Sequence, residues 1–301
     1  MNGEFDFQII ANLLAGKGEG KKKLELLKNF LKENRCTYEV TVIDTPTPIS
    51  KIPKDDKFKI QKGVICIGGD GTVSETVGYV VNNGIKVPIA VIATGTANII
   101  AGTLDLCPKE DSFDFLLADK TRKIDIGVAE FLNEKNYFLL GVGFGFEENF
   151  LRLTKEKLKS KVGILSYIFA ALAELFSLKK IPIIIENSSV QIKTNICLLT
   201  LLNLQPVVLK HFPLFKHQEI KGDDGIFNLY YVENKSYLKA FFGSLVFHIF
   251  GGMNFGLVKS VSGSEFSLDS PVYVGTQIDG ELRSKLPVKI SLLPRQIEFL
   301  I

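Results

Sequence analysis

The stretch GGDGTVSE, residues 68–75, places three glycines, an aspartate and a threonine directly after the apolar run at residues 63–67. Glycine adopts positive φ at low cost and lets another molecule approach the backbone closely. A loop that ends a parallel strand and opens a helix presents N–H groups at the positive end of the helix dipole, where anions bind. The pattern therefore predicts a phosphate-binding loop. The alternative is a tight turn into a helix whose start is capped by Thr72 and Glu75 as a capping box.

Two further loops repeat this arrangement. The segments ATGTANIIAG, residues 93–102, and ANLLAGKGEG, residues 11–20, each put glycine between an apolar strand pattern and a helical one. The carboxyl ends of neighbouring parallel strands lie at one sheet edge, where open α/β sheets bind ligands. We expect the three loops to line one crevice. None has the spacing of a Walker A loop or of the dinucleotide fingerprint.

Two acidic turns late in the chain could also take part in chemistry. In KGDDGIF, residues 221–227, Asp223 and Asp224 stand beside a glycine, and carboxylates with backbone carbonyls suit a hard cation. In IDGEL, residues 278–282, Asp279 and Glu281 flank a glycine, and a carboxylate there could accept the proton of a hydroxyl. Each segment could equally be a plain acidic turn.

The elements that must position these loops alternate between strand and helix in the first third of the chain. Strand patterns occupy residues 5–11, 38–43, 63–67 and 87–93, and an amphipathic helix pattern occupies residues 21–34. Strands that alternate with helices imply parallel pairing in an α/β layer. After about Asp125 strand-like segments joined by Gly, Asn and Ser turns predict a mostly antiparallel, β-sandwich-like second domain with a helical insert near residues 163–178.

The domain boundary is expected near residue 124. The first domain then covers residues 1–124, which the terminal segment 290–301 could rejoin, and the second covers residues 125–289. Asp70 and Thr96 are expected to face the cleft between the two domains.

Composition sets further limits. The chain has 301 residues, of which 46% are hydrophobic and 23% charged, values typical of a core-forming globular protein. A net charge of +3 is too small to argue for a nucleic-acid partner. The four cysteines are far apart, with no CxxC pair, which favours reduced, buried thiols in a cytosolic protein; they are Cys36, Cys66, Cys107 and Cys197.

No membrane-spanning helix or signal peptide is expected. The amino terminus lacks a basic start and a long apolar run. Residues 162–178 are short for a span and contain Glu174, and residues 240–258 contain His248, Asn254 and four glycines. The basic run Arg152–Lys161 could be a solvated helix face or could hold an anionic membrane surface.

The combination GGDGTVSE and GTANIIA resembles the catalytic domain of the diacylglycerol kinase family, which also contains sphingosine, ceramide and bacterial lipid kinases. The family's first loop corresponds to residues 12–16, its D-G-(L/I) element to residues 224–226 and its D-G-E element to residues 279–281. The motifs keep the family's order and rough spacing over nearly the whole chain. Leu13 and Ala15 depart from the family's Pro and Ser in the first loop.

The resemblance implies an α/β fold of the NAD kinase and diacylglycerol kinase type, with a nucleotide-binding first domain and a lipid-substrate second domain. It implies Asp279 as the general base, with Glu281 orienting or assisting. It also implies a structural Mg²⁺ at Asp224, beside Asp223. The residues expected to bind ATP are Asn12, Gly16, Thr45, Gly68, Gly69, Asp70, Gly71, Thr72, Glu75, Gly95, Thr96 and Asn98.

Asp70 would repel phosphate unless something positive intervenes. It could accept loop N–H groups, bind a ribose hydroxyl or face a magnesium ion.

The implied activity is transfer of the γ-phosphate of ATP to a lipid hydroxyl, with diacylglycerol as the first candidate and phosphatidic acid as its product. The alternatives are a sphingoid-type lipid kinase, a NAD kinase, whose family shares the GGDGT loop, and a nucleotide- or lipid-binding relative without turnover. The expected partners are a nucleotide and a lipid at a membrane surface, with a possible homodimer. A cytoplasmic protein that associates peripherally with membranes is expected, with residues 152–161 and 241–255 as candidate contacts.

Overall fold

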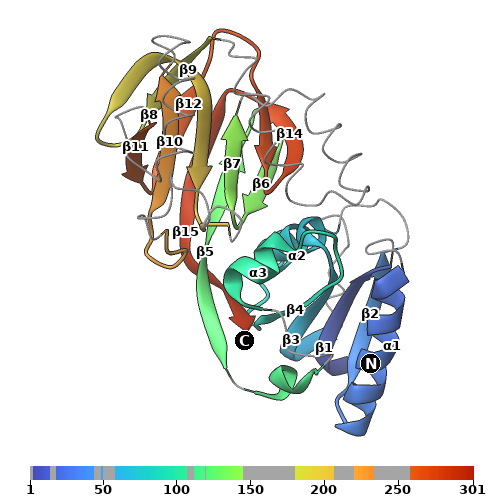
Figure 1. The fold of residues 1–301 in the computed structure, drawn as a ribbon. Helices are drawn as coiled ribbons and strands as arrows, with labels where there is room; N and C mark the ends of the chain where they lie inside the picture. The colour runs from blue at the N-terminus through green and yellow to red at the C-terminus, as the bar shows by residue number, and fades with distance from the viewer. Residues whose placement is uncertain are drawn as a thin grey trace, which may run out of the picture. The chain divides into compact units, whose positions relative to one another are not determined.

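Two strands connect the two compact units into which the chain divides. The computed structural model describes residues 3–13, 18–43, 49, 58–106, 112–118, 120–144, 180–206, 220–233 and 258–301. Unit 1 comprises residues 1–125 and 294–301, and unit 2 comprises residues 126–293. Strands β5 (Thr121–Glu130) and β15 (Val288–Leu300) therefore contribute residues to both units (Figure 1).

The sheet of unit 1 is parallel, as predicted. Its strand order is β2-β1-β3-β4, and the end of β15 extends it, because Phe299 pairs in parallel with Ile89 of β4. The strands are β1 (Gly3–Asn12), β2 (Tyr38–Ile43), β3 (Phe58–Gly68) and β4 (Ile89–Ala93). Parallel pairing brings the ends of β1, β3 and β4 to one edge, where the three glycine loops begin.

Helices α1 and α2 cover opposite faces of this sheet. Ile9 of β1 and Leu27 of α1 are both buried in one hydrophobic cluster. On the other face, Gln8 donates to the Tyr79 hydroxyl of α2 at 3.2 Å, and Thr76 contacts Cys66. The helices are α1 (Glu19–Glu33), α2 (Asp70–Asn82) and the short α3 (Ile99–Leu104), and a 3₁₀ turn covers Asp114–Leu117.

Cys66 lies fully buried in this sheet. Burial raises the pKa of its thiol to about 12, so the reactive thiolate is essentially absent at neutral pH. We expect Cys66 to resist a thiol-alkylating reagent in the folded protein at about pH 8, where an unfolded cysteine is partly ionised. Peptide mapping with and without denaturant measures this, and equal labelling in both conditions would contradict it. Cys36 is also a buried free thiol, whereas Cys107 and the Cys197 side chain lie outside the description.

Unit 2 is built from antiparallel pairs, as predicted. Strand β9 is central: it pairs with β7, β8 and β10, while β13 pairs with β7 and β14. Strand β12 joins β8 to β15, β10 pairs with β11, and β5 with β6. The strands are β6 (Lys135–Phe138), β7 (Gly141–Phe144), β8 (Ile181–Glu186), β9 (Gln191–Leu202), β10 (Phe227–Glu233), β11 (Val258–Gly263), β12 (Glu265–Asp269), β13 (Gly275–Ile278) and β14 (Glu281–Lys285).

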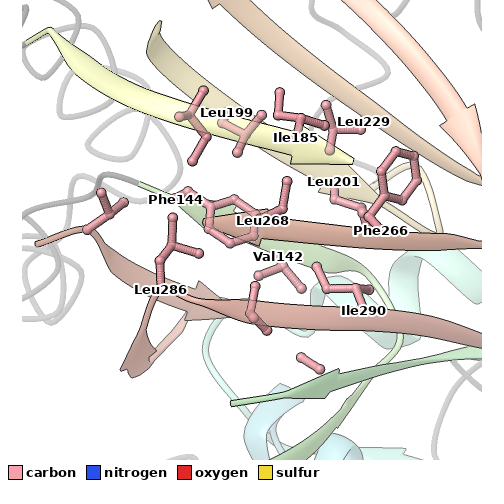
Figure 2. Packing of buried hydrophobic residues seen from close by; sticks show 14 of the residues in the cluster. Val142, Phe144, Ile185, Leu199, Leu201, Leu229, Phe266, Leu268, Leu286 and Ile290 are labelled. Atoms are coloured by element: carbon pink, nitrogen blue, oxygen red, sulfur yellow. The ribbon is translucent and has the colours of Figure 1, made fainter. Parts of the chain in front are cut away.

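The core of unit 2 is made by inward-facing side chains of these strands. Figure 2 shows Phe144, Leu199, Leu268 and their neighbours packed between the strands, and all three are at most 2% exposed. Phe138 stacks on Phe227 with ring centroids 5.7 Å apart. Burying each such side chain contributes about 1.5–3 kcal/mol to the stability of unit 2.

No helix in the described ranges has both the length and the apolar character needed to cross a bilayer. Two apolar stretches were considered from the sequence, residues 162–178 and 240–258. Except for Val258 they lie outside those ranges, as does the expected helical insert.

Candidate functional site

The GGDGT and GTAN loops touch each other through their backbones. A Cβ placed on Gly95 would lie 2.6 Å from the Gly69 Cα and 2.8 Å from the Asn98 Oδ1. The Thr94 N–H also donates to the Gly68 carbonyl at 2.8 Å. Because so short an approach excludes any side chain at Gly95, glycine is required there to bring the two predicted loops together.

Asp70 joins the two loops a second time. Its Oδ2 accepts the N–H of Ile99 at 3.0 Å and its Oδ1 accepts the N–H of Ile100 at 2.8 Å. These are the first two residues of α3, whose own N-cap residue, Asn98, has a φ of 48° and makes no side-chain cap. Of the roles expected for Asp70, the structure shows acceptance of loop N–H groups. The Asp70 carboxylate thus caps α3 from the neighbouring loop.

Thr72 and Glu75 do not form the capping box that was the alternative to a phosphate-binding loop. Helix α2 begins at Asp70 with Gly69 as its N-cap, so Thr72 lies inside the first turn. The Thr72 Oγ1 accepts from the Asn12 Nδ2 at 3.1 Å, which ties the end of β1 to α2. The Glu75 Oε2 accepts the N–H of Ile49 at 2.9 Å. The box does not form because the helix starts three residues earlier than a Thr72 N-cap would place it, at Asp70 instead of Val73.

Two buried oxygens beside these loops have no hydrogen-bond partner among the described residues: the Thr94 Oγ1 and the Asn98 Oδ1. Thr94 is only 5% exposed. Buried polar atoms nearly always have a partner, so such atoms suit a donor supplied by water or by a ligand. A nucleotide offers ribose and amino donors, and the glycines leave backbone room for it. The residues present therefore fit a nucleotide. Thr94 was not among the residues expected from the sequence, although a threonine between a strand end and a loop glycine is a usable signal.

Gly95→Ala should separate the two loops. The added methyl would overlap the Gly69 backbone, and overpacking of this kind costs about 1–3 kcal/mol. We expect a lower melting temperature and loss of ATP binding, measured by thermal unfolding and titration calorimetry. The control is Gly102→Ala at an exposed position of helix α3, which should be neutral or slightly stabilising. Normal ATP affinity in Gly95→Ala would show that loop contact is not needed for nucleotide binding.

Thr96 is exposed, and Gly71 is half-buried in the first turn of α2. Gly16 and Thr45 fall outside the part of the chain that is described, so their expected roles stay predictions.

In unit 2, Asp279 shapes a tight hairpin. Ile278 pairs with Glu281, so Asp279 and Gly280 form a two-residue turn, with φ values of 48° and 85°. Positive φ at both central residues is the requirement of a type I′ turn, for which Asp-Gly is favoured.

The Asp279 carboxylate binds the backbone between β6 and β7. Its Oδ2 accepts the N–H of Leu139 at 2.9 Å, and its Oδ1 accepts those of Leu140 and Gly141 at 2.8 and 3.1 Å. In return the Asp279 N–H donates to the Gly141 carbonyl at 3.1 Å. Three donors stabilise the ionised carboxylate and occupy most of its acceptor positions.

Asn203 holds the same corner from the other side. Its Nδ2 donates to the Leu139 carbonyl at 2.8 Å and its backbone N–H to the Leu140 carbonyl at 2.9 Å, while only 1% of Asn203 is exposed. The next residue, Leu204, packs against Gly222, where a Cβ would meet its Cδ2 at 2.1 Å. The hairpin at residues 278–281 (the acidic hairpin) and the loop at residues 223–225 (the DDG loop) thus lie at one end of unit 2. Asn203 was not among the residues expected from the sequence, where its signal was an asparagine directly after a long apolar strand.

Glu281 has a different environment from Asp279. It begins β14 with a side chain 39% exposed, and its Oε2 lies 2.8 Å from the Arg283 Nη2. Both groups are near solvent, so the pair is weak and screened. Among the described contacts, the Glu281 carboxylate therefore accepts from one side chain, whereas the Asp279 carboxylate accepts from three backbone N–H groups.

The DDG loop closes on itself. The Asp224 Oδ1 accepts the N–H of Ile226 at 3.1 Å, and Gly225 adopts a φ of 76°. Among the described residues, no three of His, Cys, Asp and Glu come close enough together to hold a metal ion. A magnesium ion at this loop stays a prediction, and no chemical step is assigned to it.

Comparison with known proteins supports the family resemblance. Residues 6–129 match the family model of the diacylglycerol kinase catalytic domain. The resemblance to the diacylglycerol kinase catalytic-domain family is confirmed. A diacylglycerol kinase of Staphylococcus epidermidis is 27% identical over 97% of this chain and 90% of its own length. One from Staphylococcus haemolyticus is 29% identical over 78% of this chain and 69% of its own.

Solved structures agree in fold. A crystal structure of a diacylglycerol kinase from Bacillus anthracis covers 98% of this chain and 97% of its own, with a TM-score of 0.67 at 17% identity. A second structure from that organism has a TM-score of 0.75 at 20% identity. The segment that matches the diacylglycerol kinase catalytic domain contains Asn12, Asp70 and both touching glycine loops, whereas the acidic hairpin and the DDG loop follow it in the chain.

Proposed function

We propose that this protein is an ATP-dependent lipid kinase that phosphorylates a lipid hydroxyl, with diacylglycerol as its first candidate substrate. The observation that carries the proposal is the joined pair of loops in the diacylglycerol kinase segment. There Asp70 caps α3, and the Thr94 Oγ1 and Asn98 Oδ1 have no described partner. Relatives named lipid kinase or diacylglycerol kinase support the reaction class.

The nucleotide is assigned to the strand ends of unit 1. Asn12, Thr72, Thr94 and Asn98 would hold it, and the glycines would admit its phosphates to the backbone. Phosphoryl transfer depends mainly on such positioning and on neutralising charge. Magnesium carried by the nucleotide would supply part of that neutralisation. Asp70, whose two oxygens already accept N–H groups, is assigned the structural role of keeping the loops together.

We assign proton acceptance to Glu281 in preference to Asp279. A general base needs an acceptor oxygen within reach of the substrate hydroxyl. Asp279 directs its carboxylate at three backbone N–H groups, whereas the described contact of the Glu281 carboxylate is the exposed Arg283. In the proposed step the lipid hydroxyl loses its proton to Glu281, its oxygen bonds to the γ-phosphorus, and the bond from that phosphorus to the β–γ bridging oxygen breaks. ADP leaves with that oxygen.

An assay with γ-labelled ATP tests the proposal against its alternatives. Purified protein is offered diacylglycerol in vesicles, sphingosine and NAD in parallel, and label is followed into each product. Label in phosphatidic acid is the expected result. Label in phosphosphingosine or NADP would replace the substrate class, and ATP binding without transfer to any acceptor would favour a non-catalytic relative.

The lipid partner and peripheral membrane association belong to the same proposal. The contacts expected at residues 152–161 and 241–255 lie outside the described ranges. The possible homodimer stays a prediction, which sedimentation equilibrium can measure.

A further inference from the structure

A surface loop of unit 2 exposes adjacent apolar side chains beside a lysine. Between β12 and β13, Tyr273 is 77% exposed and Val272 is 48% exposed, and Pro271 before them is exposed as well. The Lys285 Nζ of β14 lies 5.6 Å from the centre of the Tyr273 ring. Single exposed apolar residues are ordinary. Consecutive exposed apolar residues that include an aromatic ring, with a cation beside that ring, form a small amphipathic surface.

This loop is held in place from both sides. The Ser270 hydroxyl donates to the Pro182 carbonyl at 2.7 Å and accepts the N–H of Val272 at 3.3 Å. On the other side the Leu286 N–H donates to the carbonyl of Val274, which is only 2% exposed. Because the backbone on either side is tied to neighbouring segments, the Tyr273 ring projects from a fixed base. Its exposure is therefore built into the fold.

We propose that Pro271–Tyr273 and Lys285 together are a contact surface for an anionic lipid bilayer, and this rests on the proposed lipid kinase function. Tyrosine favours the membrane–water interface, where its ring is apolar and its hydroxyl is wet. Lysine places its stem along apolar groups and its ammonium at the lipid phosphates. Arg283, two residues before Lys285, is already paired with Glu281, so Lys285 supplies the positive charge.

A second copy of the chain fits this surface less well. Strand β14 ends the sheet path, and an exposed edge strand could pair with another chain. Its outward side chains are Glu281, Arg283 and Lys285, and charges on an edge oppose strand-to-strand pairing. A lipid surface needs no backbone pairing.

The test compares a double variant, Val272→Ser/Tyr273→Ser, with a control variant, Leu132→Ser. Leu132, at the turn between β5 and β6, is 90% exposed, so its replacement also removes an exposed apolar side chain but leaves the proposed surface intact. Both variants and the parent are sedimented with vesicles of phosphatidylcholine mixed with phosphatidylglycerol, at low and high salt. We expect the double variant to bind about tenfold more weakly, mainly in the component that resists salt, because apolar burial is not screened. Tyr273→Trp should retain binding.

A second readout separates this inference from the proposed function. Turnover is measured on long-chain diacylglycerol in vesicles and on a short-chain, water-soluble diacylglycerol. The double variant should lose turnover on vesicles and keep turnover on the soluble substrate. If the parent phosphorylates neither substrate, the proposed function fails, while the sedimentation result still judges the surface. The inference is overturned if the double variant binds vesicles as well as Leu132→Ser does. It is also overturned if the double variant changes from dimer to monomer while its vesicle binding is unchanged.

Discussion

Glu281→Gln is expected to abolish most lipid phosphorylation without weakening the fold. The amide keeps the size and hydrogen-bonding reach of the side chain but cannot take up a proton, and loss of a general base lowers turnover by about 10²- to 10⁴-fold. The ion pair with Arg283 is exposed and contributes little to stability, about 0–1 kcal/mol at most. Steady-state kinetics should therefore show a fall in kcat, with the melting temperature and ATP affinity unchanged.

Arg283→Gln is the matched control for this variant. It removes the same ion pair from the opposite side and leaves the Glu281 carboxylate in place, so turnover should stay within a few-fold of the parent. Equal losses in the two variants would show that the pair acts as a unit. Normal turnover in Glu281→Gln would remove this carboxylate from the reaction.

Asp279→Asn is expected to unfold unit 2 more readily, and its activity loss should follow from that. Either orientation of the amide would aim its NH₂ group at one or more of the N–H groups of Leu139, Leu140 and Gly141. Asparagine tolerates the positive φ of this position, so the backbone turn itself is not the problem. Losing hydrogen bonds to a charged acceptor and leaving donors unsatisfied costs about 2–3 kcal/mol.

Denaturant unfolding and turnover measured below the transition distinguish the two roles of Asp279. A lower midpoint with substantial residual turnover supports a structural carboxylate. A parent-like midpoint with turnover reduced as in Glu281→Gln would instead return the base role to Asp279, as the family resemblance implied.

Local pattern was sufficient to predict the parallel layer. The strand expected at residues 38–43 is β2, and the amphipathic helix expected at residues 21–34 is α1, displaced by at most two residues. Strand β3 begins five residues earlier than expected, at Phe58, because its polar first half pairs with β1 at Gly3–Phe5. That partner, and not an apolar run, stabilises the segment. Strands β11 and β12 were not expected, since their Lys, Ser and Glu residues hide the alternation of a half-exposed hairpin.

In the candidate site, too, the features set by local sequence were predictable, whereas those set by distant residues were not. Glycine positions, and therefore the loops, were predictable because they depend on neighbours in the chain. The partners of Asp70 and Asp279 were not, because they lie 29 or 30 and about 140 residues away in sequence. The residue types did suggest acceptors, but only the packed sheet determines which N–H groups arrive beside them. Asn203 was overlooked for this reason, since its function depends wholly on a corner built by another part of the chain.

The hydrogen bonds from Asp70 to the start of α3 determine when the two loops lose their conformational entropy, on folding or on nucleotide binding. Loops that close around a nucleotide only on binding must lose their freedom at that moment, and the affinity is reduced accordingly. Here one carboxylate fastens both loops as unit 1 folds, so their disorder is removed before any nucleotide arrives. The amides of Ile99 and Ile100 should therefore be slow to exchange with deuterium in the free protein, and adding ATP should slow them little further. Asp70→Ala would return that ordering cost to the binding step.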